Sequence, residues 1–136
     1  MYHDNTQIYK AVYISVSGTP EYLCADLNSV FSFSRVSLDS LMFAPMNNKI
    51  CMCIDSSYKR TQDNVNALAT QIYRDSFHVY SISDVVYGPA LIFSYHKDTI
   101  KNTEHLLSIT DSYIEEVTNR YLINEKISLH TPKTTS

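Results

Sequence analysis

The sequence predicts a single α+β domain in which helices pack on a mixed or mostly antiparallel sheet. The chain has 136 residues, of which 44% are hydrophobic and 18% charged, and these are ordinary values for one globular domain. Segments that alternate apolar and polar residues are interleaved with segments whose apolar residues recur every three or four positions. No repeat or linker divides the chain. We therefore expect one domain over residues 1–125 and a flexible tail over residues 126–136.

A strand and then a helix are predicted at the start of the chain. Residues 8–17 alternate in polarity and are rich in β-branched and aromatic side chains, which favours a strand that ends at Gly18. Thr19 then offers a helix N-cap, and Pro20 suits the first helical position. The apolar stripe that follows predicts a helix over residues 20–31.

A hairpin is predicted next. Residues 34–44 favour a strand, with a bulge where the alternation slips between Leu38 and Leu41. A turn over residues 45–48 joins it to a second strand over residues 49–56. Both sides of that second strand are apolar, which predicts a central strand covered on each face.

Three further regular segments and a last helix complete a predicted order of β-α-β-β-α-β-β-α. A helix that Thr61 caps runs to about Tyr73, and its apolar residues keep the spacing of a buried stripe. Strands follow over residues 77–82 and 90–95. The last helix begins at Thr110 or Asp111 and ends near Ile123, with a start as early as Thr99 left open.

Charge and hydropathy narrow the classes of partner. The formal net charge of −3 disfavours broad nucleic-acid binding, which needs clustered Lys and Arg. No apolar run approaches the roughly 20 residues needed to span a bilayer, and the first residues do not resemble a secretion signal. The three cysteines are an odd number in apolar segments, which favours reduced thiols. We expect a soluble, cytoplasmic protein with no membrane partner.

Two interpretations of the cysteines remain. Cys51 and Cys53 share one face of a predicted strand, where two metal ligands could sit. A structural zinc site needs four ligands, and the chain would have to recruit Cys24 and a distant His78 or His96. A cysteine among Ile and Met residues usually packs as a small hydrophobic residue. We favour packing, and we expect no metal and no cofactor.

Enzymatic motifs are not evident. The chain has no glycine-flanked serine elbow, dinucleotide fingerprint or phosphate loop, and its histidines are scattered. Cys24 lies inside the first predicted helix, away from its positive end. The sequence does not decide whether the protein is an enzyme, although it favours a non-enzymatic role. A hydrolase that uses carboxylates stays open as a third class, with candidates Asp26, Asp39, Asp55 and Asp84.

A basic turn predicts a tentative anion site. Lys59 and Arg60 come just before the helix that Thr61 is expected to cap, where free N–H groups and the helix dipole favour anions. Tyr58 could stack on a base or donate a hydrogen bond. The site would therefore comprise Tyr58, Lys59, Arg60 and Thr61, and the alternative is a turn that these residues only solubilise.

Tyrosines suggest a second kind of surface. The chain has eleven, and tyrosine is enriched at the energetic centres of protein interfaces. Most are expected to be half-buried with their hydroxyls in water. An exposed cluster would mark a binding face, for which we expect Tyr80, Tyr87 and Tyr95.

Three short stretches resemble an uncharacterised family of small proteins, a domain of unknown function found in phages, bacteria and large DNA viruses. They are residues 18–23 (Gly-Thr-Pro-Glu-Tyr-Leu), 66–70 (Asn-Ala-Leu-Ala-Thr) and 85–90 (Val-Val-Tyr-Gly-Pro-Ala). The resemblance implies a viral or phage origin and adds no biochemistry.

The function expected from the sequence is that of a non-enzymatic interaction or regulatory protein. Its partner would be a host or viral protein, or a second copy of the chain through self-association. The alternative is a binding module or inhibitor that captures a nucleotide or another anion at the turn of Tyr58, Lys59 and Arg60.

Overall fold

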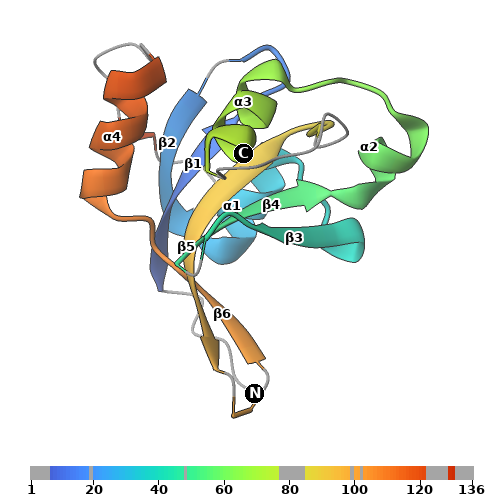
Figure 1. The fold of residues 1–136 in the computed structure, drawn as a ribbon. Helices are drawn as coiled ribbons and strands as arrows, with labels where there is room; N and C mark the ends of the chain where they lie inside the picture. Colours follow the sequence, from blue (N-terminus) through green and yellow to red (C-terminus); the bar gives the residue numbers. More distant parts are fainter. Residues whose placement is uncertain are drawn as a thin grey trace.

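One sheet forms the centre of the molecule (Figure 1). The computed structural model describes residues 7–18, 20–47, 49–76, 85–98, 100–101, 103–121 and 129–130. The strands in these ranges are β1 (Ile8–Ile14), β2 (Pro20–Asp26), β3 (Leu41–Pro45), β4 (Ile50–Asp55), β5 (Ala90–Asp98), β6 (Thr103–Leu107) and β7 (Leu129–His130). The helices are α1 (Leu27–Ser34), α2 (Ser56–Thr61), α3 (Ala67–Asp75) and α4 (Asp111–Tyr121), with one 3-10 turn, η1 (Leu38–Ser40). The predicted class, an α+β domain with a mostly antiparallel sheet, is confirmed.

The strands lie in the order β3-β4-β5-β1-β2-β7, and β6 pairs with β5 beside this path. Every pairing is antiparallel except that of β2 with β7. β5 changes partners along its length. Up to Ser94 it pairs with β4, and from Ser94 onward it pairs with β6. Beyond that point the two strands form an arm that extends from the body of the molecule (Figure 1).

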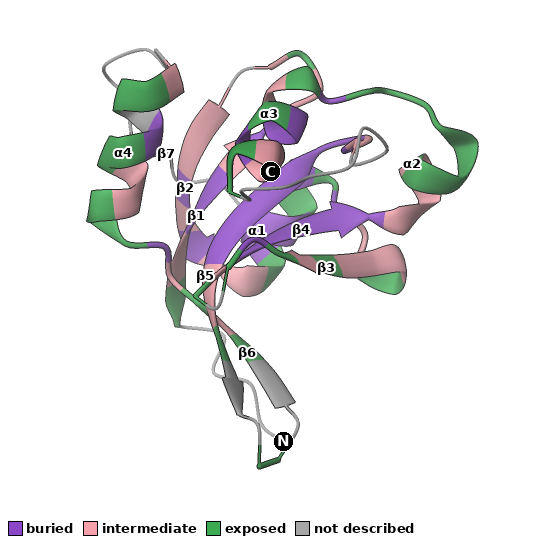
Figure 2. Cartoon of the chain, viewed as in Figure 1, coloured by how far each residue is buried: buried purple, intermediate pink, exposed green. Residues whose placement is uncertain are grey.

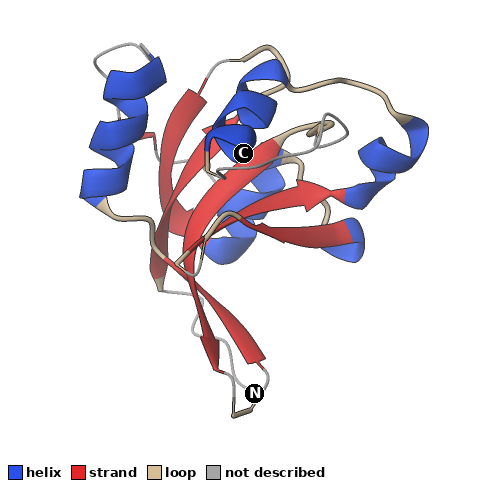
Figure 3. Cartoon of the chain, in the orientation of Figure 1, coloured by secondary structure: helices blue, strands red, loops and turns tan. Residues whose placement is uncertain are grey.

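Helices cover both faces of the sheet (Figure 3). On one face the core includes Ile72 of α3 and Val117 of α4. On the other face it includes Val30 and Phe31 of α1. The sheet is therefore the middle of three layers, and its central strands are shielded from water on both sides.

β4 is buried on both faces, as its sequence predicted. Cys51 and Cys53 lie on the α1 face and are 1% and 0% exposed, whereas Met52 lies on the α3 face and is 0% exposed. Figure 2 shows β4 in the colour of buried residues and β3 beside it in the colours of partly and fully exposed ones. The expectation that the two thiols pack as core residues is confirmed.

The helix predicted over residues 20–31 is wrong in its first half. Pro20–Asp26 forms β2, which pairs with β1 along its whole length, and α1 begins only at Leu27. The carboxylate of Asp26 caps α1 by accepting the backbone N–H of Ser29 at 2.9 Å. Pairing with a neighbouring strand outweighs a weak local preference for helix.

The strand predicted over residues 34–44 is also wrong in its first part. α1 continues to Ser34, and Arg35 ends it in the left-handed conformation with φ of 63°. η1 occupies Leu38–Ser40, where a bulge was expected. Only Leu41–Pro45 is strand, and it forms the predicted hairpin with β4.

The helix predicted to start at Thr61 begins later. Thr61 is the last residue of α2, and Gln62 and Asn64 both have positive φ, so no helix can run through them. Asn66 caps α3 instead. Val65, which was expected on the buried stripe, is 54% exposed.

The second half agrees better with the expectations. The strand over residues 90–95 is confirmed and extends to Asp98. α4 begins at Asp111, as predicted, and the early start near Thr99 is wrong because Thr103–Leu107 pairs with β5. The strand predicted over residues 77–82 lies outside the described residues. The same holds for most of the predicted tail, within which Leu129–His130 forms β7.

Candidate functional site

Asn66 joins three segments at one end of the sheet. Its side chain is fully buried, and its amide Nδ2 donates to the carbonyls of Ile14 at 3.0 Å and Gly88 at 2.9 Å. Its Oδ1 accepts the N–H of Ala69 at 3.1 Å, and its own N–H donates to the carbonyl of Val86 at 2.8 Å. Every polar group of Asn66 is therefore engaged in holding β1, α3 and the segment before β5 together.

The hydroxyl of Thr70 extends this junction by accepting the N–H of Val86 at 2.8 Å. We call the group of Ile14, Asn66, Thr70, Val86 and Gly88 the Asn66 junction. Residues 66–70 and 85–90, two of the stretches that resemble the uncharacterised family, meet in it. Because both donors and the acceptor of the Asn66 amide are occupied, the junction is a structural centre.

Asp55 forms a second buried polar centre, at the end of β4. Its Oδ1 accepts the N–H of Ser57 at 2.9 Å and its hydroxyl at 2.6 Å, which caps α2, and its Oδ2 accepts the N–H of Ser37 at 3.4 Å. Burial acts to raise the pKa of the carboxyl, but hydrogen bonds from Ser57, Ser37 and Ser40 hold the pKa below its usual value. The carboxylate thus ties α2 to the segment that leads into β3.

The predicted anion-site residues all lie in α2. Lys59 and Arg60 are exposed in the last turn of this helix, at its negative end, and Thr61 ends it. The expectation that the basic residues precede a helix N-terminus is wrong, because α3 starts after Asn66, whose side chain caps it. Anion binding by Tyr58, Lys59, Arg60 and Thr61 stays a prediction.

Tyr58 packs against Gly88. A Cβ atom placed on Gly88 would lie 2.6 Å from two carbons of the Tyr58 ring, so the ring and the backbone are in close contact. Gly88 has φ of 78°. Part of the aromatic surface that was expected to stack on a base is therefore covered by the protein itself.

The predicted tyrosine interface is not an exposed cluster. All tyrosines in the described ranges are half-buried. Tyr87 forms an isolated backbone bridge with Val65, Tyr95 packs against the core on the α1 face, and Tyr80 lies outside the described residues. A role of Tyr80, Tyr87 and Tyr95 in binding stays a prediction.

Two tyrosine hydroxyls attach α4 to its neighbours. Tyr22 donates to Asp111 at 3.1 Å, and Tyr121 donates to Asp75 at 2.6 Å. Burial and these hydrogen bonds raise the pKa of Tyr22 and of Tyr121 to about 12. These hydrogen bonds join α4 to β2 and to α3.

No group of three His, Cys, Asp or Glu side chains that could hold a metal forms within the described part of the chain. The hydrogen bond with Cys51, together with burial, raises the pKa of the Cys53 thiol. Cys24 is half-buried in β2. His96 and His105 are exposed and face each other across the arm, and His78 lies outside the described residues.

Three of the carboxylates kept for a hydrolase lie in the described part of the chain. Asp26 and Asp55 each cap a helix, and Asp39 is exposed in η1. Asp84 lies outside the described residues.

The outer side of β3 is a free edge, since no other described strand pairs with it. The N–H of Met46 donates to the carbonyl of Ile50 at 2.8 Å, which fixes the direction of the backbone groups. Because these directions alternate along an antiparallel strand, Met42 and Ala44 bond to β4. The backbone groups that point outward belong to Leu41, Phe43 and Pro45.

Two observations support this assignment. The N–H of Tyr95 donates to the carbonyl of Lys49 at 2.8 Å, so the odd-numbered residues of β4 bond to β5 and the even-numbered ones to β3. Pro45 has no N–H, and proline within a sheet is confined to such outward-facing positions.

The edge carries no charge and exposes apolar side chains. β3 reads Leu-Met-Phe-Ala-Pro, whereas edge strands are commonly protected by charged residues or bulges. Phe43 is 40% exposed, and Leu38, just before the strand, is 56% exposed. Phe43 lies opposite Cys53, on the α1 face of the sheet.

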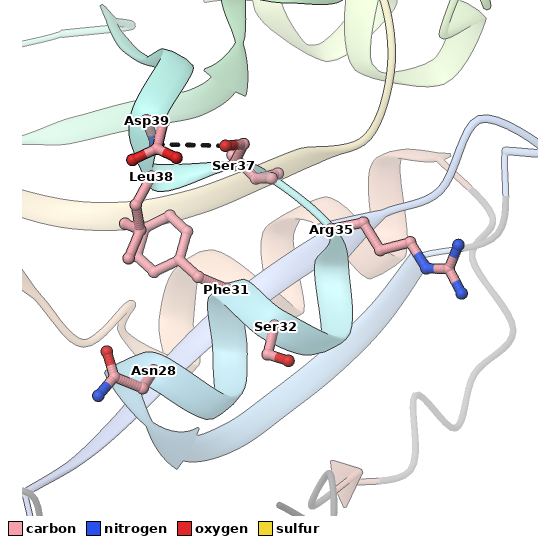
Figure 4. Close-up of a pocket in the computed structure, with 8 residues that line it drawn as sticks. Asn28, Phe31, Ser32, Arg35, Ser37, Leu38 and Asp39 are labelled. Atoms are coloured by element: carbon pink, nitrogen blue, oxygen red, sulfur yellow. Dashed lines mark hydrogen bonds between the residues drawn. The ribbon is translucent and has the colours of Figure 1, made fainter.

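An open groove of about 510 Å³ lies beside the start of β3 (Figure 4). In Figure 4, Phe31 of α1 points toward Leu38 of η1, and Arg35 points away from both. Ser37 Oγ accepts the N–H of Asp39 at 3.2 Å, and both residues line the groove. The lining residues are Asn28, Phe31, Ser32, Arg35, Val36, Ser37, Leu38 and Asp39.

We define the β3 surface as the outward-facing edge of Leu41–Pro45 together with this groove. Local sequence patterns predict the hairpin but not this surface, since which strand lies at the edge depends on the order of the whole sheet. The signals present in the sequence were Pro45 at a strand end and the lack of any charge over residues 40–48.

The chain matches no family model, no curated protein and no solved structure. The resemblance of its three short stretches to an uncharacterised family stays a prediction. None of the helices in the described ranges is long and apolar enough to cross a membrane.

Proposed function

We propose that this chain is a non-enzymatic interaction protein, of viral or phage origin, that holds an extended segment of a partner protein along the β3 surface. The supporting observation is the outward direction of the backbone groups of Leu41, Phe43 and Pro45 on an uncharged edge. Addition of a strand to a free sheet edge is a recurring mode of peptide recognition, in which main-chain hydrogen bonds supply affinity.

The groove supplies a place for side chains of the added segment. Its apolar lining comes from Phe31, Val36 and Leu38, and Arg35 and Asp39 lie at its polar rim. In strand addition, pockets that accept alternate side chains provide specificity. We expect a preferred partner segment that is extended and carries one apolar side chain for this groove.

The test is a selection of displayed random peptides on the protein, followed by amide hydrogen exchange of the complex. Binding should slow exchange at Leu41 and Phe43, whose N–H groups point outward. Exchange at Met42 and Ala44 should change little, because their N–H groups already bond to β4. The substitution Phe43→Lys should weaken binding more than about tenfold.

Val65→Lys is the matched control, because Val65 is a similarly exposed apolar residue outside the β3 surface. Peptides that bind Phe43→Lys and the unmodified chain equally, or that leave exchange at Leu41 and Phe43 unchanged, would contradict the proposal. Capture of an anion at Lys59 and Arg60 is the less supported alternative, because α3 begins beyond them with its own cap.

A further inference from the structure

We infer that His96 of β5 and His105 of β6 together bind one divalent transition-metal ion of the kind that prefers imidazole ligands, such as Zn²⁺ or Ni²⁺. The two residues lie on the arm, which shares no residue with the β3 surface, so the site is independent of the proposed function. With two protein ligands it differs from the four-ligand structural zinc site that the sequence disfavours. Three features carry the inference: the backbone register, the shared face and the exposure of the two imidazoles.

The backbone register sets His96 directly opposite His105. Ser94 pairs with β4 on one side of β5 and with β6 on the other side. The N–H of Tyr95 points toward β4, because it donates to the carbonyl of Lys49 at 2.8 Å. Since these directions alternate along a strand, the even-numbered residues at this end of β5 bond to β6. The two histidines therefore form a hydrogen-bonded pair, in which the Cα atoms lie about 5.5 Å apart.

Both imidazoles lie on the same face of the arm. Directly opposite residues of an antiparallel pair share a face, with Cβ atoms about 4.5–5.5 Å apart. Ile92 of β5 belongs to the core on the α3 face, and alternation along the strand places His96 on that face as well. Leu106, next to His105, packs on the α1 face, so His105 points the other way. The two rings therefore lie side by side on the α3 face.

The spacing of the pair suits one metal ion. Zinc binds imidazole nitrogen at about 2.0–2.1 Å, so two such nitrogens in a tetrahedral site lie roughly 3.3 Å apart. This distance is shorter than that between the two Cβ atoms, and the side-chain rotamers of histidine allow the rings to lean toward each other. Water completes the coordination, because the protein fills two of the four positions.

The pair is open to solvent, and its strands are anchored. His96 and His105 are both exposed, so an ion can reach them. β5 continues into the core, where Ile92 is 0% exposed. β6 leads into a segment tied to β1, since the N–H of Ile109 donates to the carbonyl of Lys10 at 2.8 Å. Two ligands held on anchored strands bind one ion as a chelate, and their effective concentration raises the affinity above that of a single histidine.

The type of ligand selects the metal. Imidazole suits zinc, copper and nickel, whereas magnesium and calcium prefer oxygen ligands. Affinity should therefore rise from Co²⁺ through Ni²⁺ to Cu²⁺ and fall again at Zn²⁺, with no binding of Mg²⁺. Lower pH should weaken binding, because a protonated imidazole has no nitrogen lone pair to offer.

The first experiment measures the binding of Zn²⁺ and Ni²⁺ to the full chain by isothermal titration calorimetry. His96→Ala and His105→Ala should each raise the dissociation constant more than about tenfold, because each leaves one histidine that can no longer chelate. The double variant should be little weaker than either single variant. Two independent sites would instead lose half of the bound metal and keep the same constant. Circular dichroism establishes that the variants are folded.

The other histidines and the half-buried thiol provide the controls. A variant in which His3, His78 and His130 are all replaced by alanine should keep the affinity of the unmodified chain. Cys24→Ser should keep it as well, since Cys24 lies in β2 and outside the arm.

The second experiment uses NMR spectroscopy to test whether the two rings share one ion. The ring resonances of His96 and His105 should shift together and stop shifting at one equivalent of Zn²⁺. An unmodified chain that binds no Zn²⁺ at about millimolar concentration, or one whose affinity survives either alanine substitution, would overturn the inference. Ring resonances that shift separately, or equal binding of Mg²⁺ and Zn²⁺, would overturn it too.

Discussion

Backbone polar groups are bonded within the protein at the Asn66 junction, whereas at the β3 surface they point outward. At the junction, the carbonyls of Ile14 and Gly88 are buried and bonded to a side-chain amide. At the edge, the N–H and C=O groups of Leu41 and Phe43 point away from the sheet. The first arrangement completes the fold, and the second leaves bonding capacity for another chain. The comparison therefore assigns stability to the first region, and the proposed association concerns the second.

The largest loss of stability is expected at the junction. Asn66→Ala removes the cap of α3 and leaves two buried carbonyls without donors, which should lower the free energy of unfolding by roughly 4 kcal/mol. Urea unfolding measures the change. Asn28→Ala, at an exposed position of α1, is the control and should cost less than about 0.5 kcal/mol. Similar small effects of both substitutions would remove the distinction between the two regions.

Gly88→Ala should have the next largest effect, roughly 3 kcal/mol. The new Cβ meets the Tyr58 ring at 2.6 Å, and the positive φ of 78° is strained for alanine. Replacing Tyr58 with alanine relieves the first cause and leaves the second. A double-mutant cycle should therefore show that Gly88→Ala costs less in the Tyr58→Ala background. Equal costs in both backgrounds would contradict the close packing of Tyr58 on Gly88.

Proline substitutions at two successive residues of β3 sharpen the comparison within one strand. Ala44→Pro removes an N–H that bonds to β4 and should lower the free energy of unfolding by about 2 kcal/mol. Phe43→Pro removes an outward-facing N–H, so it should cost less stability while it weakens peptide binding. Urea unfolding and the affinity for a selected peptide provide the two readouts. If Phe43→Pro proves the more destabilising, the assigned direction of the backbone groups is wrong.

The smallest effect is expected from pH at Asp55. The folded-state pKa of its carboxyl lies below the unfolded value of about 3.9, so its contribution is present above that value and is lost as the pH falls through the folded-state pKa. Asp55→Ala should thus cost roughly 1 kcal/mol at pH 7 through the lost cap of α2. The difference between the two proteins should shrink below pH 4 in urea unfolding curves. A difference that is constant from pH 7 to pH 3 would contradict this role of the carboxylate.

Sequence patterns predicted the parts of the fold in which local and long-range preferences agree. The apolar residues of β4 and the hairpin turn before it predicted a covered central strand, and Thr110 with Asp111 predicted the start of α4. The helix predicted over residues 20–26 was wrong because pairing with β1 outweighs the helix-like start of this segment. The prediction that a helix starts at Thr61 was wrong for another reason. Asp55 caps a separate short helix, and the chain turns at Gln62.

Local sequence patterns could not predict the β3 surface. A hairpin can be predicted from two strands and a turn, but the free side of β3 follows from β4 being paired with β5, which lies almost forty positions further along the chain. The polar partners of Asn66 are equally distant in sequence, at Ile14 and Gly88. Its helix-capping role could have been inferred from its residue type just before Ala67, and its role as a link between segments could not.

β5 has a mechanical consequence for the whole molecule. Its first residues lie in the middle of the core, and its last residues form one side of the arm, without a glycine or a proline between them. A hinge commonly needs such a residue or a break in pairing, and Ser94 is paired on both of its sides. A contact made at Ile100, which is 94% exposed at the end of the arm, would therefore act on a strand that continues into the centre of the sheet.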